Sequence, residues 1–194
     1  DILLLSDEVY EHITFVAQGH LSLSSRPNLA ARSFVISSFG KTTHTTGWKV
    51  GYCCAPSELT HELRKVHQFM VFTVPSPFQH ALAEYTKDPS TYRALPDFYQ
   101  AKRDRLAQGL RKTRLVPYAC PGTFFLLADY SNISDAPEAE FAVWLTQNHG
   151  VTVIPLSAFY ADQKSADANH KLVRFCFAKN DQTLDDAINK LRSV

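Results

Sequence analysis

The sequence is poor in the residues that mark several common kinds of site. Its 194 residues include only seven glycines, and none of them stands in a GxGxxG, GxxxxGKS/T or GxSxG pattern. The usual dinucleotide, Walker and hydrolase-elbow signatures are therefore absent from this sequence. Eight histidines form no HxxxH pair and four cysteines form no pair at zinc-finger spacing, so we expect no metal site. With no signal peptide ahead of them, the cysteines predict free thiols and a cytoplasmic location.

Charge is balanced, and long apolar runs are also lacking. Twenty basic residues face nineteen acidic ones, for a net charge of +1, so nucleic acids and anionic membranes are poor candidate partners. The longest apolar stretches fall far short of the roughly 20 residues that cross a bilayer. They are Ile2–Leu5, Phe124–Ala128 and Val151–Leu156. Because 45% of the residues are hydrophobic and no run is long enough to cross a bilayer, we expect a soluble, folded protein.

Apolar patterns predict an α/β first half. A helix is expected where Leu59, Leu63, Val66 and Met70 recur on one face, and we interpret it by default as a structural helix. Continuous apolar runs predict strands at Ile2–Leu5, Ser33–Ser38 and Trp48–Cys54, the first two buried on both faces, and a further helix is predicted at Phe78–Lys87.

The second half is predicted to be an α+β unit of its own. A helix from Pro96 to Lys112 leads into it, and Ser134-Asp135 with Glu138 forms a predicted capping box. The other expected elements are strands at Phe124–Tyr130, Val151–Ile154 and Leu172–Ala178 and helices at Glu138–Asn148 and Asp181–Arg192, the first of them closed by Gly150. We therefore divide the chain into part of a larger domain at 1–88, a connecting helix at 89–116 and a small domain at 117–194.

A lysine behind a predicted strand is the first candidate for chemistry. Lys41 follows the strand Ser33–Ser38 after only Phe39 and Gly40. A lysine held at a sheet edge and partly desolvated deprotonates readily and can attack a carbonyl carbon, as a Schiff-base lysine must. The structural alternative is a solvated turn residue, which is the common situation of a single lysine.

Four neighbours of this lysine suit a phosphate-bearing aldehyde cofactor. Asp7 ends the first predicted strand, and a buried carboxylate there would keep a pyridine nitrogen protonated. Tyr10 can offer a phenol to a ring hydroxyl oxygen, while Ser38 and Lys49 supply a hydroxyl and a cation for a phosphate. The structural alternatives are a cap for Asp7, a core position for Tyr10, a turn for Ser38 and the surface for Lys49.

Four ordered motifs resemble those of one enzyme family. They are Asp7-Glu-Val-Tyr10, Ser38-Phe-Gly-Lys-Thr42, Gly47-Trp-Lys-Val-Gly-Tyr52 and Val173-Arg-Phe-Cys-Phe-Ala178. In this order they resemble the fold-type I, pyridoxal-phosphate-dependent class I/II aminotransferases over the whole chain. The sequence segments SDEVYEH, GWKVGY and RFCFAK are most similar to the methionine aminotransferase and kynurenine aminotransferase branch of this family. That branch includes glutamine transaminase K and cysteine-conjugate β-lyase.

The resemblance implies a role for each candidate residue. Lys41 would bind pyridoxal 5'-phosphate covalently, Asp7 would pair with the ring nitrogen, Tyr10 would donate to the 3-hydroxyl oxygen, and Ser38 and Lys49 would hold the phosphate. Arg174 would bind the substrate α-carboxylate, the alternative being an ion pair with an acid of this chain. Phe72 would form an aromatic wall of the side-chain pocket, the alternative being a core position.

The resemblance also implies the fold, the reaction and the assembly. The fold is part of a large α/β domain, with a mainly parallel sheet and helices, joined to an α+β small domain. The reaction is transamination between methionine, glutamine or an aromatic amino acid and a 2-oxo acid, in a homodimer. Two alternatives stay open, namely β-elimination from cysteine S-conjugates at the same site and a truncated, non-catalytic aminotransferase-like module. Because the sequence begins within an apolar run, we expect a fragment, and the greater length of the family members implies that it is the C-terminal half of such an enzyme, with weak or absent catalysis on its own.

Overall fold

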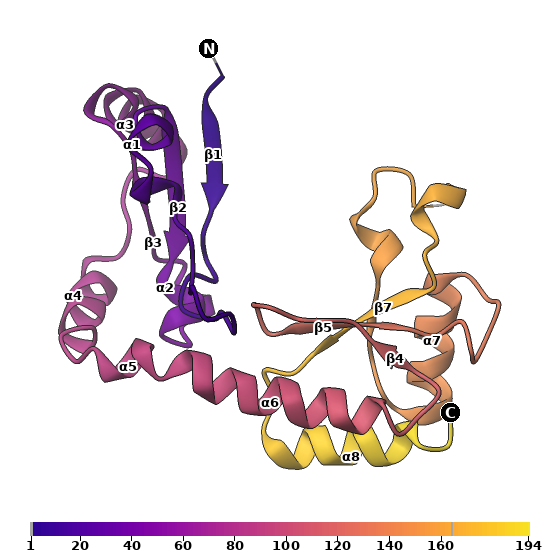
Figure 1. Cartoon of the computed structure of the whole chain (residues 1–194). Coiled ribbons are helices and arrows are strands. Elements are labelled where there is room, and N and C mark those ends of the chain that lie inside the picture. Colours follow the sequence, from indigo (N-terminus) through magenta and orange to yellow (C-terminus); the bar gives the residue numbers. More distant parts are fainter. Residues whose placement is uncertain (1, 164) are drawn as a thin grey trace. The chain divides into compact units, whose positions relative to one another are not determined.

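A three-stranded sheet forms the centre of the first unit, residues Asp1–Pro96, in the computed structural model of the chain (Figure 1). The strands are β1 (Leu4–Asp7), β2 (Ser33–Ser38) and β3 (Gly51–Cys54), in the order β1-β2-β3. β1 runs parallel to β2, and β3 runs antiparallel to β2. The structure describes residues 2–163 and 165–194, so Asp1, where the predicted segment 1–88 begins, lies outside the described residues.

These strands differ from the prediction in burial and in bounds. Leu5 of β1 is 73% exposed and Ile36 of β2 is 37% exposed, whereas Val35 is buried. The prediction of two-sided burial is therefore wrong for this chain, because the side chains on one face of each strand meet solvent. The strand predicted from Trp48 begins only at Gly51, since a 3-10 helix, η2 (Thr46–Trp48), and a left-handed Lys49 precede it.

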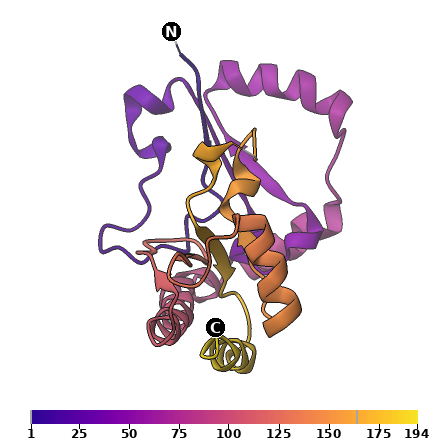
Figure 2. The ribbon, with the colours of Figure 1, turned by 90° about the vertical axis from the view of Figure 1, so that its right-hand side faces the viewer.

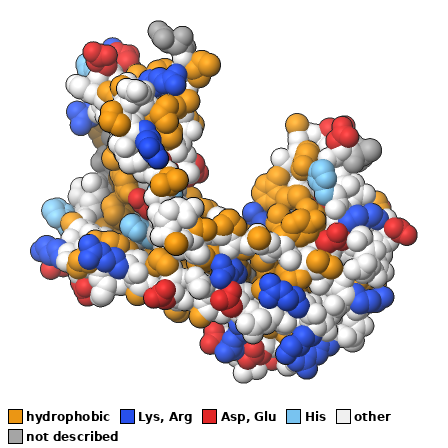
Figure 3. Space-filling view, viewed as in Figure 1, with side chains coloured by type: hydrophobic (Ala, Val, Ile, Leu, Met, Phe, Trp, Pro, Cys, Tyr) orange, Lys and Arg blue, Asp and Glu red, His pale blue; other side chains and the backbone are white. Residues whose placement is uncertain are grey.

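Helices of very different burial complete the first unit. Three are short, namely η1 (Leu23–Ser25), α1 (Pro27–Ala30) and α2 (Phe39–Thr42), and they are followed in the chain by α3 (Ser57–Met70), α4 (Ser76–Tyr85) and α5 (Ser90–Arg93). α4 buries Leu82, but α3 buries no residue at all, and its Val66 and Met70 are 54% and 78% exposed. The apolar face of α3 is therefore exposed within the described residues, although its spacing is typical of a helix that packs. Hydrophobic side chains are visible on the surface of this unit in Figure 3.

The second unit, Asp97–Val194, contains a four-stranded antiparallel sheet. Its strand order is β4-β5-β7-β6, with β4 (Val116–Pro117), β5 (Phe125–Asp129), β6 (Ile154–Pro155) and β7 (Leu172–Cys176). The helices of this part of the chain are α6 (Leu95–Leu110), α7 (Glu138–His149) and α8 (Asp181–Leu191), with the 3-10 helices η3 (Leu156–Phe159) and η4 (Ala166–Ala168).

Two helices of the second unit, α6 and α8, lie side by side (Figures 1 and 2). Lys102 donates to Asp181 at 2.8 Å and Arg105 donates to Asp185 at 2.9 Å across them. Gly109 of α6 allows the close approach, because a Cβ there would lie 2.5 Å from Ile188. The core beneath them includes Leu106, Leu110, Leu126, Phe141, Leu145, Val173, Leu184 and Leu191.

The sequence predicts a capping box at the start of α7 and a closing glycine at its end, and the structure confirms only the glycine. Gly150 closes the helix in the left-handed conformation with φ of 63°, as a C-terminal glycine does. The predicted capping box is wrong, because Pro137 occupies the N-cap and Ser134 accepts the N–H of Ala136 instead. Glu138 turns inward and is only 1% exposed. In the described residues, no helix is both long and apolar enough to cross a bilayer.

Candidate active site

Strand pairing in the first unit collects the candidate cofactor residues at one sheet edge. Asp7 and Ser38 end the parallel strands β1 and β2, so both lie at the carboxyl edge of the sheet. β3 runs in the opposite direction, and its first residue, Gly51, pairs with Ser38. Lys49, two residues before Gly51, therefore reaches the same edge, and Lys41 reaches it through α2.

Lys41 is presented by a short helix that Ser38 caps. The Ser38 hydroxyl accepts the N–H of Gly40 at 3.1 Å and donates to the carbonyl of Val50 at 3.3 Å. Gly40 allows a tight turn here, because a Cβ would lie 2.9 Å from the backbone of Thr46. Lys41 itself is half-buried on α2. These local hydrogen bonds agree with the structural alternative, in which Ser38 is a turn residue. Its binding of a phosphate stays a prediction.

Lys49 holds an unusual backbone conformation. Its φ and ψ of 56° and 39° lie in the left-handed region, and the side chain is exposed. That conformation costs a residue other than glycine about 1–2 kcal/mol, and such strain is found preferentially where function requires a side chain direction. It also ends η2 and leads the chain into β3, so Lys49 lies at the carboxyl edge of the sheet.

Asp7 and Tyr10 occupy the turn that leaves β1. Asp7 is exposed, so the expected buried carboxylate is wrong for this chain. Its Oδ1 accepts the N–H of Val9 at 3.1 Å, which agrees with the alternative reading of Asp7 as a strand-end cap. Tyr10 is half-buried, and its carbonyl accepts the N–H of Ile13 at 2.8 Å.

Glu8 holds this turn in place through its hydrogen bonds, although the sequence predicted no role for it. It is 5% exposed and accepts from His20 at 2.8 Å, from Ser6 at 3.0 Å and from the N–H of Leu23 at 3.0 Å. Burial alone raises the pKa of this carboxyl group, but the hydrogen bonds from His20, Ser22, Leu23 and Ser6 outweigh burial and lower the pKa to about 2. Glu8 therefore ties the 20–23 segment to the end of β1, next to Asp7.

Glu11 forms a second anchor of the same turn. One of its oxygens accepts from Ser37 of β2 at 2.7 Å and from the Tyr52 hydroxyl of β3 at 2.5 Å. Burial and the hydrogen bond to Glu11 raise the pKa of Tyr52 to about 12. A cavity of about 280 Å³ adjoins this cluster and is also lined by Ser38 and His12. No sequence signal marked Glu8 or Glu11, because all the partners named here except Ser6 lie 12 to 41 residues away.

Phe72 follows α3 in an exposed position. It is 80% exposed, its φ is 67°, and its N–H donates to the carbonyl of His67 at 2.9 Å. The alternative of a core position is therefore wrong for this chain. The role of Phe72 as an aromatic wall of the side-chain pocket stays a prediction.

Arg174 lies in the middle of β7 in the second unit. Its guanidinium carbon is 3.9 Å from the ring centre of Phe125 and 4.6 Å from that of Phe159, and we call these three residues the arginine stack. Such cation–π contacts contribute about 0.5–2 kcal/mol each. The Nε atom is buried and has no hydrogen-bond partner within the described part of the chain. Among the described residues no acid pairs with Arg174, so the structural ion pair is not found there.

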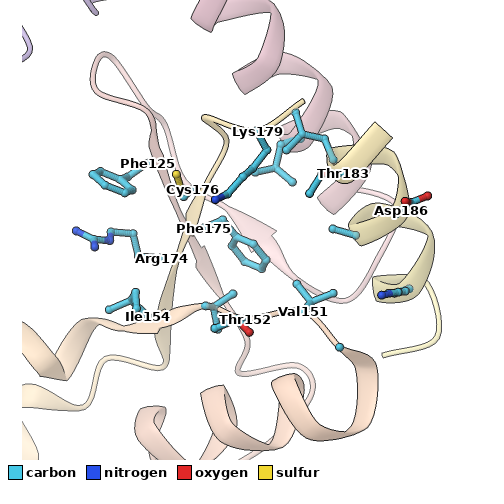
Figure 4. A pocket seen from close by; sticks show the side chains of 16 residues that line it. Phe125, Val151, Thr152, Ile154, Arg174, Phe175, Cys176, Lys179, Thr183 and Asp186 are labelled. Atoms are coloured by element: carbon cyan, nitrogen blue, oxygen red, sulfur yellow. The ribbon is translucent and has the colours of Figure 1, made fainter. Parts of the chain in front are cut away.

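A cavity of about 510 Å³ lies beside β7 (Figure 4). Ile154, Arg174 and Cys176 line it from the sheet, and Thr183 and Asp186 line it from α8. Arg174 also lines a shallower cavity of about 360 Å³ with Cys120 and Phe159. The buried nitrogen and the adjoining open space together favour an anionic group as the missing partner.

Comparisons with known proteins agree on one family. A profile of the family described as aminotransferase class I and II matches residues 1–191. Methionine aminotransferase of Escherichia coli strain K12 is 52% identical over 195 residues, covering 100% of this chain and 50% of the relative. Kynurenine–oxoglutarate transaminase 3 of Rattus norvegicus is 40% identical over 204 residues, covering 96% of this chain and 45% of the relative.

A solved structure is similar over the same extent. The crystal structure of YbdL from Escherichia coli, which is described with a methionine aminotransferase function, has a TM-score of 0.95 and 52% identity. The alignment covers 100% of this chain and 50% of that one, so the chain spans about half the length of the curated relatives it matches. With a family match that extends over residues 1–191, the chain belongs to the class I and II aminotransferase family.

Proposed function

We propose that this chain carries the cofactor lysine and the substrate arginine of a pyridoxal-phosphate-dependent aminotransferase. The proposed reaction moves an amino group between methionine, glutamine or an aromatic amino acid and a 2-oxo acid. The observation that carries the proposal is the sheet edge of the first unit, where Lys41 lies with Asp7, Ser38 and Lys49. Family membership supports it, because members of this family use pyridoxal phosphate.

The chemistry of the side chains at this edge fits pyridoxal phosphate. The five candidate residues at this edge offer a primary amine in a half-buried position, a carboxylate, a phenol, a hydroxyl and a further cation. These groups match the aldehyde, the ring nitrogen, the ring hydroxyl and the phosphate of the cofactor. When bound, pyridoxal phosphate supplies an aldehyde that combines with amines and a ring that withdraws electrons from the substrate Cα.

Each residue of the edge has a separable task in this proposal. Asp7 holds a proton on the ring nitrogen through its carboxylate, and Tyr10 orients the ring through its phenol. Ser38 and Lys49 bind the phosphate with a hydroxyl donor and a cation. The Lys41 amine would bind the aldehyde of the cofactor and would also move the proton at the substrate Cα.

Substrate recognition is assigned to Arg174 and Phe72. The guanidinium of Arg174 would bind the α-carboxylate with two parallel hydrogen bonds, which is consistent with its buried and unpartnered Nε. Phe72 would contact the substrate side chain. The names of the methionine and kynurenine relatives support apolar and aromatic side chains as the substrate class. A homodimer and a cytoplasmic location remain predictions.

The direct test is to locate the cofactor on the full-length protein. Borohydride reduction followed by peptide mapping should leave a pyridoxyl group on Lys41. Lys41→Ala should abolish the label, whereas Lys65→Ala, on the exposed surface of α3, should leave it unchanged. A label on Lys49 or Lys65 in the unmodified protein would contradict the assignment of Lys41.

Product analysis tests the reaction class. Transamination of methionine yields a 2-oxo acid with the carbon skeleton unchanged, whereas β-elimination from a cysteine conjugate yields pyruvate and a thiol. We expect the first product to accumulate faster when both substrates are supplied at equal concentration. A full-length protein that takes up the label yet forms neither product would favour the non-catalytic module.

A further inference from the structure

Glu138 is a fully buried carboxylate for which the proposed function has no use. It is the first residue of α7 and is 1% exposed. Its three hydrogen bonds all come from backbone N–H groups, those of Ser157 at 2.5 Å, His170 at 2.9 Å and Leu172 at 3.0 Å. A buried carboxylate with three such donors is satisfied as an anion and orders the segments that donate to it.

The two oxygens of Glu138 hold different elements. Oε2 accepts from Ser157 in η3, two residues before Phe159. Oε1 accepts from His170 and from Leu172, the first residue of β7 and two residues before Arg174. One side chain thus joins the element that carries Phe159 to the strand that carries Arg174.

The arginine stack depends on the same two elements. Arg174 extends from β7 and its guanidinium lies against the ring of Phe125 and the ring of Phe159. Because Nε makes no hydrogen bond to the described residues, ring contacts rather than polar contacts set the direction of the guanidinium. The ring of Phe159 comes from a short 3-10 helix and is 57% exposed, so its placement needs an anchor.

We propose that Glu138 is a positioning residue for carboxylate recognition, because its two oxygens hold η3 and β7 together and so keep Phe159 stacked on Arg174. The inference rests on the proposed function only in taking Arg174 as the ligand of the substrate carboxylate. A second tie, the 2.7 Å hydrogen bond between Tyr160 and His170, joins the same two ends further along the segment. Glu138 acts through Arg174 and touches no substrate.

The test uses the full-length, cofactor-loaded protein and the variants Glu138→Gln and Arg174→Lys, alone and combined. An amide in place of the carboxylate keeps the volume but turns an NH2 group toward a backbone donor, so one of the two ties is lost. We expect Glu138→Gln to raise KM for methionine about tenfold with kcat within about twofold. In the Arg174→Lys background the same change should add less than about twofold, because its effect passes through Arg174.

Equilibrium binding provides a readout that does not depend on turnover. Titration calorimetry with 3-phenylpropionate, a monocarboxylate without an amino group, should show about tenfold weaker binding for Glu138→Gln. Glu140→Gln is the matched control, since Glu140 is on the same first turn of α7 but is exposed. It should bind 3-phenylpropionate as the unmodified protein does.

Phe159→Leu keeps the proposal testable if Glu138→Gln does not fold. This exposed position tolerates an apolar replacement, and loss of the ring should raise KM about threefold to tenfold without lowering the melting temperature. An unchanged KM in Phe159→Leu would overturn the inference, as would a full tenfold effect of Glu138→Gln in the Arg174→Lys background. If Arg174→Lys alone binds carboxylates normally, the proposed role of Arg174 fails together with the inference. If only Glu138→Gln is without effect, the inference alone fails.

Discussion

Helices α3 and α8 show how one sequence pattern leads to opposite environments. Both carry apolar residues at helical spacing along one face. In α8 these residues form core, with Leu184 3% exposed and Leu191 0% exposed. In α3 no residue is buried, and Met70 is 78% exposed. Amphipathic spacing therefore identifies a helix and its apolar face, but not whether the chain contains a surface to cover that face.

The same contrast extends to the two units. The second unit surrounds its sheet with α6, α7 and α8 and buries large side chains such as Tyr130 and Phe141, whose rings stack at 3.9 Å. The first unit places the proposed cofactor residues on a sheet with exposed faces. In the proposed division of labour, the first unit performs the chemistry and the second recognises the carboxylate.

Asp7→Ala should have the largest effect, because it removes the carboxylate that we propose keeps the ring nitrogen protonated. The full-length protein should retain the cofactor weakly and lose turnover by about 10³-fold, equivalent to about 4 kcal/mol in the barrier. Stopped-flow measurement of Cα proton transfer checks this expectation. Near-normal rates would mean that Asp7 serves only as the strand-end cap that its hydrogen bond to Val9 suggests.

Leu191→Ala should reduce the free energy of unfolding by about 2–5 kcal/mol, because it leaves a cavity between α8 and the core. Met70→Ala on α3 is the matched substitution at a site of similar size, and it should change the stability of this chain by about 0.5 kcal/mol at most. Urea denaturation of the two variants gives the comparison. An equal loss would show that some further surface covers α3.

Glu8→Gln should lower stability at pH 7 by about 2–3 kcal/mol, since the pKa of the buried carboxyl group is lowered to about 2 from 4.5. A lowered pKa stabilises the folded state above pH 4.5, and this contribution disappears as the pH falls toward 2. The difference between the variant and the unmodified protein should therefore shrink between pH 4.5 and pH 2. Denaturation curves at pH 7, 4 and 3 measure it, and a constant difference would argue against a charged Glu8.

Arg174→Lys should have the smallest effect of this series, because charge is kept and only the two-pronged geometry is lost. We expect KM for amino acids to rise about tenfold to a hundredfold, equivalent to about 1.4–2.7 kcal/mol, with amines that lack a carboxylate little affected. Steady-state kinetics with methionine and with a matched amine that lacks the carboxylate measures this difference in KM. Equal losses for both substrates, or a fall in melting temperature without ligand, would indicate a structural role.

Local signals in the sequence predicted much of the element order. Ser33–Ser38 is a strand with the expected bounds, and the helix expected at Asp181–Arg192 ends one residue earlier. Gly150 ends α7 as expected because its signal needs only its own backbone. The capping box does not form, because the Glu138 carboxylate accepts from backbone N–H groups 19 to 34 residues away. No local sequence pattern contains these donors.

The sequence by itself determined the features that depend on neighbouring residues and on ordered motifs. These are the helices and strands, the aminotransferase family and the short list of side chains suited to its cofactor. The tertiary structure alone decided which side chains are buried and which distant groups meet. Glu8, Glu11 and Glu138 acquire their partners only when segments far apart in the chain come together. The reason is that a carboxylate, once buried, must be satisfied by whatever donors the fold brings to it.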